Sequence, residues 1–207
     1  MLDSIKQEII KYGSLAGVKN FTPGISGNIS VRYGDKVVIT ASGSANGYLE
    51  PEDLVVTDFD GNLIDGCKNA SSEKFLHIEF YKKRPDVNCV FHVHSPYLTA
   101  FASCGIGLTE GVSPEIIYCF GEIPVAEYAI PGSDELVKKT SKFFDKFDVV
   151  LMQNHGVVIA AGTVKEAYLK LELAEMYAKT IICTKFLGGA KILSKEEIEK
   201  IYLLRQK

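Results

Sequence analysis

The residues with the clearest chemical potential are two histidines in the stretch Val90-Phe91-His92-Val93-His94. Side chains in a β-strand alternate between the two faces, so histidines at positions i and i+2 point the same way. Their ring nitrogens can therefore bind one metal ion. Because the same pattern is also typical of polar side chains on a solvated sheet face, its meaning depends on further ligands.

A third histidine, His155, lies in the turn Gln153-Asn154-His155-Gly156 between two apolar segments. A turn of this kind projects its side chains at the end of a sheet. A lone histidine there commonly bonds its own backbone, but three imidazoles form a recurring catalytic zinc set that leaves one coordination position open. We expect the fourth histidine, His77, to be a packed or supporting residue and not a metal ligand.

Glu73 follows Ser71-Ser72 at the start of a predicted helix. The helix dipole alone favours a glutamate in this place. Beside a divalent ion, the same carboxylate can be a weak ligand without substrate and a proton acceptor once substrate displaces it. The two serines, with N–H groups at a helix N-terminus, also form a candidate anion site.

Two other segments of small residues, Ser26-Gly27-Asn28 and Ser42-Gly43, favour turns in which successive N–H groups converge on a phosphate. Each segment alone is typical of an ordinary loop. Together with the serines before Glu73, they predict a phosphorylated substrate held by neutral donors. The net charge of −3 agrees, since it provides no general basic field for nucleic acid or an anionic membrane.

The composition is that of an ordinary globular protein, with 207 residues, 46% hydrophobic and 24% charged. This length predicts one domain over residues 1–207. Five scattered cysteines without a CxxC spacing favour reduced thiols. The chain shows neither a signal-peptide pattern nor an apolar run of about 20 residues, so we expect a cytoplasmic protein that does not contact membranes.

Hydrophobic periodicity predicts strands and helices that alternate along most of the chain. Strands are expected at Ile29 to Tyr33, Lys36 to Thr40, Leu54 to Phe59, Asn62 to Ile64, around His92, at Asp148 to Met152 and at Val157 to Ala160. Helices are expected from Asp3 or Ser4 to Gly13 or Gly17, from Ser72 to Arg84, after Gly132, from Thr163 towards Phe186 and after Ser194. The tight turns between early strands favour a mainly antiparallel sheet. The fold class is therefore α/β (α+β), with helices packed on one sheet, and only the segment from Gly105 to Tyr128 shows no clear period.

In order and spacing, these motifs resemble the class II aldolase/adducin family, most closely its L-fuculose-phosphate-type, zinc-dependent aldolases. The matching stretches are Ser26-Gly27-Asn28-Ile29-Ser30, Thr40-Ala41-Ser42-Gly43, Ser71-Ser72-Glu73, His92-Val93-His94 and Gln153-Asn154-His155-Gly156. The resemblance covers nearly the whole chain and implies a single three-layer αβα domain. It also implies a cyclic homotetramer whose active sites lie between subunits.

The resemblance implies Zn²⁺ or another divalent transition metal, one per subunit, on His92, His94 and His155, with Glu73 beside it. It further implies phosphate contacts from Gly27, Asn28, Ser42, Gly43, Ser71 and Ser72. The implied reaction is reversible retro-aldol cleavage of a ketose 1-phosphate, similar to fuculose 1-phosphate, into dihydroxyacetone phosphate and an aldehyde. In this reaction Glu73 would transfer the proton at carbon, and the ion would stabilise the enediolate.

The sequence departs from the family pattern at one position. Family aldolases use a tyrosine from across a subunit boundary to handle the proton on the aldehyde oxygen. An ungapped register places Ser113 there, and Tyr118 is the nearest tyrosine that can replace it if the loop shifts. Both residues are therefore candidates for this role, and Tyr118 is equally consistent with a place in the core.

Other functions remain open. Pentose-phosphate 4-epimerases share the scaffold but have aspartate where this chain has Glu73, whereas methylthioribulose 1-phosphate dehydratases keep a glutamate. A non-catalytic adducin-like module is disfavoured because all three histidines and Glu73 are present. A cupin is disfavoured by the lack of a glutamate shortly after His94, and an amidohydrolase barrel by its need for about 250 residues.

Overall fold

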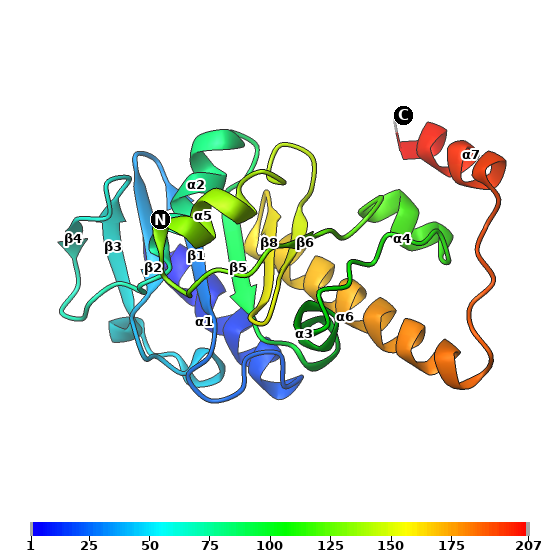
Figure 1. Cartoon of the computed structure of the whole chain (residues 1–207). Helices are drawn as coiled ribbons and strands as arrows, with labels where there is room; N and C mark the ends of the chain where they lie inside the picture. Colours follow the sequence, from blue (N-terminus) through cyan, green and yellow to red (C-terminus); the bar gives the residue numbers. More distant parts are fainter. Residues whose placement is uncertain (1, 206–207) are drawn as a thin grey trace.

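The computed structural model describes residues 2–205, which form one mixed sheet with helices on both faces (Figure 1). The 8-stranded sheet has the order β4-β3-β2-β1-β5-β8-β7-β6. Neighbouring strands within it are antiparallel except for the parallel pair β6 and β7, which confirms the mainly antiparallel prediction. The strands are β1 (Asn28–Tyr33), β2 (Lys36–Thr40), β3 (Leu54–Asp58), β4 (Leu63–Asp65), β5 (Cys89–Val93), β6 (Val125–Ala126), β7 (Val149–Met152) and β8 (Gly156–Ala161).

The helices divide between the two faces of the sheet. Helices α2 and α5 contribute to the core on one face, and α1, α3 and α6 to the core on the other, which gives three layers. None of the helices in the described part of the chain has the length and apolar composition needed to span a bilayer. The helices are α1 (Leu2–Val18), α2 (Lys74–Lys83), α3 (Pro96–Ser103), α4 (Pro114–Cys119), α5 (Asp134–Thr140), α6 (Val164–Phe186) and α7 (Lys195–Arg205), with short 3₁₀ turns η1 (Asn46–Tyr48) and η2 (Pro51–Asp53).

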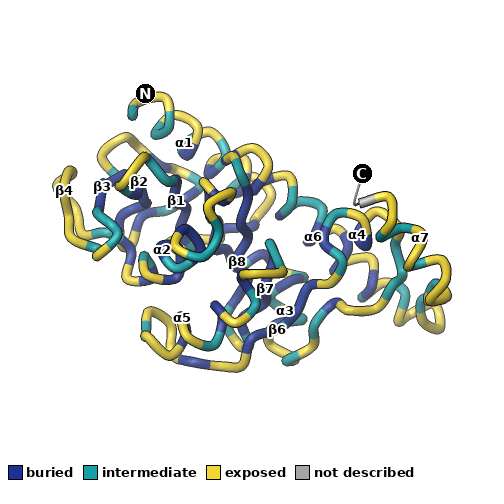
Figure 2. Tube along the Cα trace, turned by 90° about the horizontal axis from the view of Figure 1, so that it is seen from above, coloured by how far each residue is buried: buried dark blue, intermediate teal, exposed yellow. Residues whose placement is uncertain are grey.

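The alternation of side chains along β1 directs polar groups to one face of the sheet. Ile29 and Val31 are buried in the core beneath α1 and α6. Asn28 and Ser30 point to the opposite face, where their side chains meet α2. The central strands β5, β7 and β8 are buried along their whole length because both of their faces are covered. Figure 2 shows the trace of β8 in dark blue. Polar residues on these central strands therefore lie inside the protein.

The structure confirms the predicted starts of the helices, with small shifts in the first residue. The Thr163 hydroxyl accepts a hydrogen bond from the Glu166 N–H, and Ser194 and Glu197 bond reciprocally before α7. Helix α2, however, begins at Lys74 and not at Ser72. The Ser71 hydroxyl accepts from the Glu73 N–H and the Ser71 carbonyl from the Lys74 N–H, so a turn comes before the helix.

The segment without a clear period contains two short elements. Helix α4 has six residues and β6 has two, which is too short to show a repeat in the sequence. Leu108 and Ile123 form an isolated antiparallel bridge that closes this segment on itself. Helix α4 packs on α6 and α7, beyond the edge of the sheet (Figure 1).

Candidate active site

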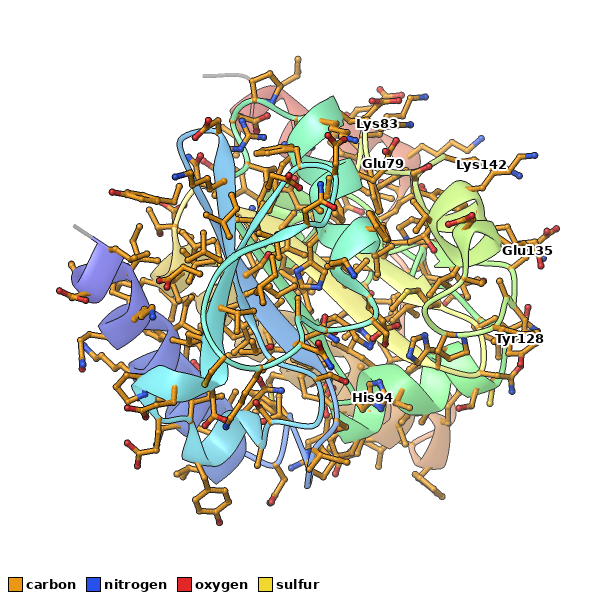
Figure 3. All side chains as sticks on the ribbon, turned by 90° about the vertical axis from the view of Figure 1, so that its left-hand side faces the viewer. Glu79, Lys83, His94, Tyr128, Glu135 and Lys142 are labelled. Carbon is orange, nitrogen blue, oxygen red and sulfur yellow. The ribbon has the colours of Figure 1, made fainter. Side chains whose placement is uncertain are left out.

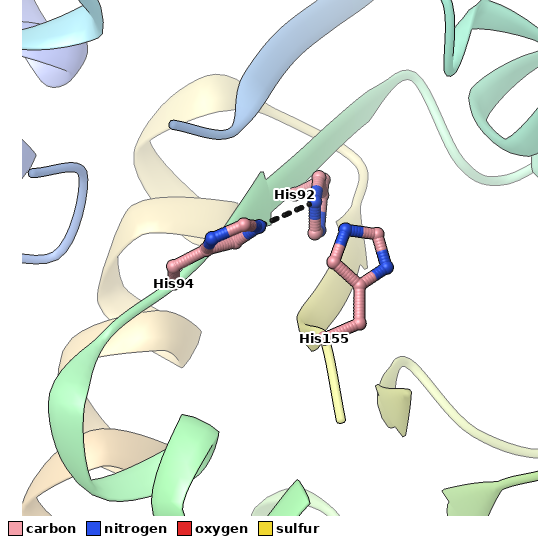
Figure 4. Close-up of side chains that lie close together, drawn as sticks. All are labelled: His92, His94 and His155. Atoms are coloured by element: carbon pink, nitrogen blue, oxygen red, sulfur yellow. Dashed lines mark hydrogen bonds between the residues drawn. The ribbon is translucent and has the colours of Figure 1, made fainter. Parts of the chain in front are cut away.

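The three predicted histidines meet at one end of the central strands. His92 lies on β5, His94 follows the end of that strand, and His155 lies in the turn before β8. One ring nitrogen from each of them lies within 4.8 Å of the others (Figure 4). The Nε2 atoms of His92 and His94 are 3.1 Å apart. The structure thus brings together the set that the sequence predicted.

The backbone around His94 is shaped to place its ring. A Cβ atom on Gly156 would lie 2.6 Å from the Val93 carbonyl oxygen and 2.8 Å from Cδ2 of His94. A side chain at position 156 would therefore displace the strand or the ring. Beyond His94, the buried carboxylate of Glu175 on α6 accepts hydrogen bonds from the N–H groups that open α3.

Glu175 was not predicted from the sequence. Its signal is an acidic residue among the inward-facing positions of a long amphipathic helix, between Leu171 and Ala178. Its carboxylate also accepts a hydrogen bond of 2.8 Å from the Ser95 hydroxyl, which follows His94 directly. Because this carboxylate fixes the chain immediately after His94, it supports the histidine cluster from α6.

Glu73 directs its carboxylate into the histidine cluster and not to its own helix. It occupies the N-cap position of α2 but makes no side-chain capping bond, which excludes a simple capping role. Its Oε2 lies 3.2 Å from Nε2 of His92, and its Oε1 lies 3.5 Å from Nε2 of His155. The Asn28 amide donates a 3.0 Å hydrogen bond to Oε2. The carboxylate is buried, with 8% of the residue exposed.

The electrostatics of the cluster couple Glu73 to His92. Burial would lower the pKa of His92, but the Glu73 carboxylate and the Val157 carbonyl outweigh it and raise this pKa. Burial would raise the pKa of Glu73, but the imidazoles of His92 and His155 and the Asn28 amide outweigh it and hold this pKa well below its usual value. Burial, together with the neighbouring His92, lowers the pKa of His94 and of His155 to about 4. Both rings are therefore neutral near pH 7, which is the form that ligates metals.

The residues present fit a divalent transition metal. Oε1 of Glu73 is buried without a hydrogen-bond partner among the described residues, and it lies 3.5 Å from Nε2 of His155. Buried polar atoms normally have partners, so an added ligand would satisfy an atom that the chain leaves open. Three imidazole nitrogens and one carboxylate oxygen are a donor set typical of zinc.

The predicted phosphate loops lie at the same end of the sheet as the histidines. Gly27 has a φ of +75°, and its Cβ would lie 2.4 Å from the His92 carbonyl oxygen, so this loop packs directly on β5. A bridge between Ala41 and Ala70 brings the Ser42-Gly43 turn beside Ser71-Ser72. The loops therefore gather as predicted around the start of β1 and the end of β2.

Not every N–H group of these loops faces outward. The Ser42 N–H donates to the Asn69 carbonyl, and the Ser71 N–H donates to the Thr40 carbonyl. These two N–H groups hold the loops to each other and are therefore not available to a ligand. In these two loops, the hydroxyls of Ser42 and Ser71, together with Gly43 and Ser72, are left as candidate contacts for a phosphate.

The two candidates for the aldehyde proton lie away from the histidines. Ser113 precedes α4 and lines a groove with Met176 and Tyr177 of α6. Tyr118 lies on α4 with 48% of its surface exposed. Within residues 2–205, the structure does not bring either of them to the histidines of the same chain.

The loop after β6 borders the site and was missed from the sequence. Gly132 packs against Ser72, and the Tyr128 N–H donates to the side chain of Gln153 in the His155 turn. In Figure 3, Tyr128 lies on the same half of the molecule as His94, opposite the end of α2 that carries Lys83. The sequence marked only its end, where Gly132 precedes a predicted helix, because the rest of the loop lies beside the segment that lacks periodicity.

Comparison with known proteins places these features in a family. The model for the class II aldolase and adducin N-terminal domain matches residues 7–182. A 5-deoxy-D-ribulose 1-phosphate aldolase of Bacillus thuringiensis is 32% identical over 203 residues, which cover 97% of this chain and 95% of that one. An L-fuculose phosphate aldolase of Methanocaldococcus jannaschii is 36% identical, covering 84% and 93%. A 3-oxo-tetronate 4-phosphate decarboxylase of Haemophilus influenzae is 34% identical, covering 90% of each.

The fold agrees with a solved structure of the same kind. An L-fuculose 1-phosphate aldolase superposes with a TM-score of 0.91 at 30% identity, covering 99% of this chain and 97% of that one. The names of these relatives describe lyases that break a carbon–carbon bond. Family model, sequence relatives and fold thus agree with the histidine and glutamate geometry: this chain belongs to the class II aldolase and adducin family.

Proposed function

We propose that the chain is a metal-dependent aldolase that reversibly cleaves a ketose 1-phosphate, similar to fuculose 1-phosphate, into dihydroxyacetone phosphate and an aldehyde. The observation that carries this proposal is the buried carboxylate of Glu73, whose Oε1 has no hydrogen-bond partner among the described residues and lies 3.5 Å from Nε2 of His155. A base in this position can reach a carbon acid bound beside the three histidines.

The residues assign the proton transfers as follows. In cleavage, the hydroxyl on carbon 4 loses its proton as the bond between carbons 3 and 4 breaks and the aldehyde forms. The group at the aldehyde oxygen takes this proton, the Glu73 carboxylate takes up one proton in exchange through water, and Glu73 then gives it to carbon 3, so that no net proton is released. In condensation, the Glu73 carboxylate takes that proton back. A zinc ion or another divalent transition metal, one per subunit on His92, His94 and His155, would supply a Lewis acid for the negative charge that develops on the substrate oxygens.

The remaining contacts come from the loops and from a neighbouring subunit. We place the phosphate against Gly27, Asn28, Ser42, Gly43, Ser71 and Ser72, which lie beside Glu73 and the end of β5. Tyr118 or Ser113 would handle the proton on the aldehyde oxygen from across a subunit boundary, because neither lies near the histidines of its own chain. This arrangement requires a neighbouring subunit, and we propose a homotetramer with sites between subunits that works in the cytoplasm.

A second candidate reaction is decarboxylation of a 3-oxo-tetronate 4-phosphate, favoured by the 34% identity to the Haemophilus influenzae enzyme. Loss of carbon dioxide from such a 3-oxo acid leaves the enediolate of dihydroxyacetone phosphate, which is also the product of aldol cleavage. Glu73 would protonate the same carbon in both reactions. Decarboxylation produces no aldehyde, so it has no need for a tyrosine at the position where the register places Ser113.

A substrate screen on zinc-loaded protein separates these reactions. The substrates are fuculose 1-phosphate, 5-deoxyribulose 1-phosphate, ribulose 1-phosphate, methylthioribulose 1-phosphate and 3-oxo-tetronate 4-phosphate. We expect dihydroxyacetone phosphate together with an equal amount of aldehyde from at least one ketose 1-phosphate. If only the 3-oxo acid reacts and releases carbon dioxide, the chain is a decarboxylase and the aldolase proposal is wrong. If the substrates only lose water, the chain is a dehydratase.

A further inference from the structure

Behind Glu73, a chain of buried polar side chains connects β1 to α2. Asn28 and Ser30 lie two residues apart on β1, and Glu73, His77 and Tyr81 lie four residues apart along α2. Two residues of strand advance about 6.6 Å and four residues of helix about 6 Å, so the two rows stay in step. The side chains of the two elements therefore interdigitate and contact one another in alternation.

The hydrogen bonds of this network of side chains are short and continuous. From the surface of the site inward, the Asn28 amide bonds Glu73 at 3.0 Å, and Nε2 of His77 meets Oδ1 of Asn28 at 2.5 Å. Nδ1 of His77 meets the Ser30 hydroxyl at 2.8 Å, and that hydroxyl meets the Tyr81 hydroxyl at 2.6 Å. His77 and Ser30 are fully buried, and Tyr81 is 2% exposed.

The orientation of the Asn28 amide fixes the direction of the bonds in this network. Its Nδ2 donates to Oε2 of Glu73, so its Oδ1, which can only accept, faces Nε2 of His77. An oxygen facing His77 requires that Nε2 of the imidazole carries the proton. The neutral ring then accepts at Nδ1, so Ser30 donates to it and accepts in turn from Tyr81.

The surroundings keep each donor in the required form. Burial, with the neighbouring His92, lowers the pKa of His77 to about 3, so its ring is neutral near pH 7. Burial raises the pKa of the Tyr81 hydroxyl, so this group remains a donor. Because the side chains are enclosed between strand and helix, solvent does not offer alternative partners.

We propose that His77 is a positioning residue that holds the Asn28 amide in one orientation and thereby keeps the Glu73 carboxylate aimed between His92 and His155. Without the Nε2 proton, the Asn28 amide is free to flip and place Oδ1 against the carboxylate. Glu73 would then turn away from the site. The kinetic consequence rests on the proposed role of Glu73 in proton transfer, whereas the bond directions do not.

The direct test is the tautomer of His77. The chain has four histidines, so a long-range ¹H–¹⁵N spectrum of its imidazoles is simple, and His77→Gln identifies the His77 signals by their loss. We expect Nε2–H with an unprotonated Nδ1, in metal-free and in zinc-loaded protein. An Nδ1–H tautomer would overturn the proposal, because His77 would then accept from Asn28 and leave Oδ1 facing Glu73.

Steady-state kinetics test the consequence on a ketose 1-phosphate that the wild type cleaves. His77→Leu removes the donor, and we expect kcat to fall about 10- to 100-fold with KM and zinc content little changed, as for other residues that support a metal site from behind. His77→Gln keeps an N–H for Asn28 and should recover most of this loss. Equal losses in both variants, or an unchanged kcat in a folded His77→Leu protein, would contradict the proposal.

Thr57→Val is the matched control, since the Thr57 hydroxyl on β3 is also buried but has no hydrogen-bond partner in the described part of the chain. It should leave kcat unchanged. If His77→Leu does not fold, His77→Gln decides the kinetic arm: near-wild-type turnover supports the proposal, and a loss as deep as that of Glu73→Gln overturns it. If the wild type cleaves no ketose 1-phosphate, the proposed function fails while the tautomer still decides the positioning role.

Discussion

The histidine–glutamate cluster lies at one end of the central strands of the sheet. Helix α4 lies beyond the edge of the sheet, against α6 and α7. In the cluster, Glu73 and His92 are buried, and they are held by Asn28 of β1 and by the Val157 carbonyl of β8. On α4, Tyr118 is 48% exposed and faces no partner in the cluster. We infer that binding of the ion and proton transfer at carbon are built into one chain, while handling of the aldehyde oxygen depends on contact with another.

The largest effect is expected from His155→Ala, which removes one of three ligands from the self-contained cluster. Zinc content should fall far below one ion per chain, and turnover should fall with it to the background level. Metal analysis after gel filtration, beside the activity assay, measures both. A variant that keeps a full zinc complement would show that His155 is a turn residue and not a ligand.

Glu73→Gln should separate metal binding from catalysis inside the same cluster. The amide keeps the shape of the side chain but cannot take a proton, so turnover should fall about 10²- to 10⁴-fold. Zinc content and the far-ultraviolet circular dichroism spectrum should match the wild type. Near-wild-type turnover would mean that another group moves the proton at carbon.

Tyr118→Phe probes the second region and should have a smaller effect. If this hydroxyl handles the proton on the aldehyde oxygen, cleavage should slow by about 100-fold at most, with unchanged zinc content. Ser113→Ala, assayed in parallel, identifies which of the two candidates acts. Tyr33→Phe at the far end of β1 is the matched control and should keep full activity. If neither candidate variant changes the rate, α4 takes no part in the reaction.

The smallest effect concerns the pH dependence of stability in metal-free protein. The pKa of His77 is about 3 when folded and about 6.5 in an ordinary environment, so the unfolded chain binds this proton more readily. The stabilising contribution of neutral His77 is therefore complete above pH 6.5 and declines as pH falls towards 3. It changes by about 1.4 kcal/mol for each pH unit in that window.

Urea unfolding at several pH values between 7 and 4.5 measures this slope. The free energy of unfolding of His77→Gln should fall less steeply with decreasing pH than that of the wild type. Tyr118→Phe should keep the wild-type slope because α4 lies outside the buried network. Equal slopes for His77→Gln and the wild type would show that His77 does not contribute a buried neutral ring.

The contrast between the histidine–glutamate cluster and α4 also explains which features could be predicted from the sequence. His92 and His94 are two residues apart on one strand, and Glu73 and His155 flank recognisable helix and strand ends, so local patterns sufficed for the cluster. The contact between Asn28 and His77 joins residues 49 positions apart through strand–helix packing, which no local pattern encodes. Helix α4 and strand β6 were missed because six and two residues are too short for a period.

The central claim is that Glu73 transfers a proton at the carbon of dihydroxyacetone phosphate. Hydrogen exchange into that compound in D₂O, without any aldehyde, tests this step alone and is common to the aldolase and the decarboxylase reactions. Zinc-loaded wild type and Tyr118→Phe should both exchange a hydrogen of the hydroxymethyl carbon, as followed by ¹H NMR. Glu73→Gln with a full zinc complement should exchange it about 10²- to 10⁴-fold more slowly. Equal exchange rates in the wild type and Glu73→Gln would contradict the account.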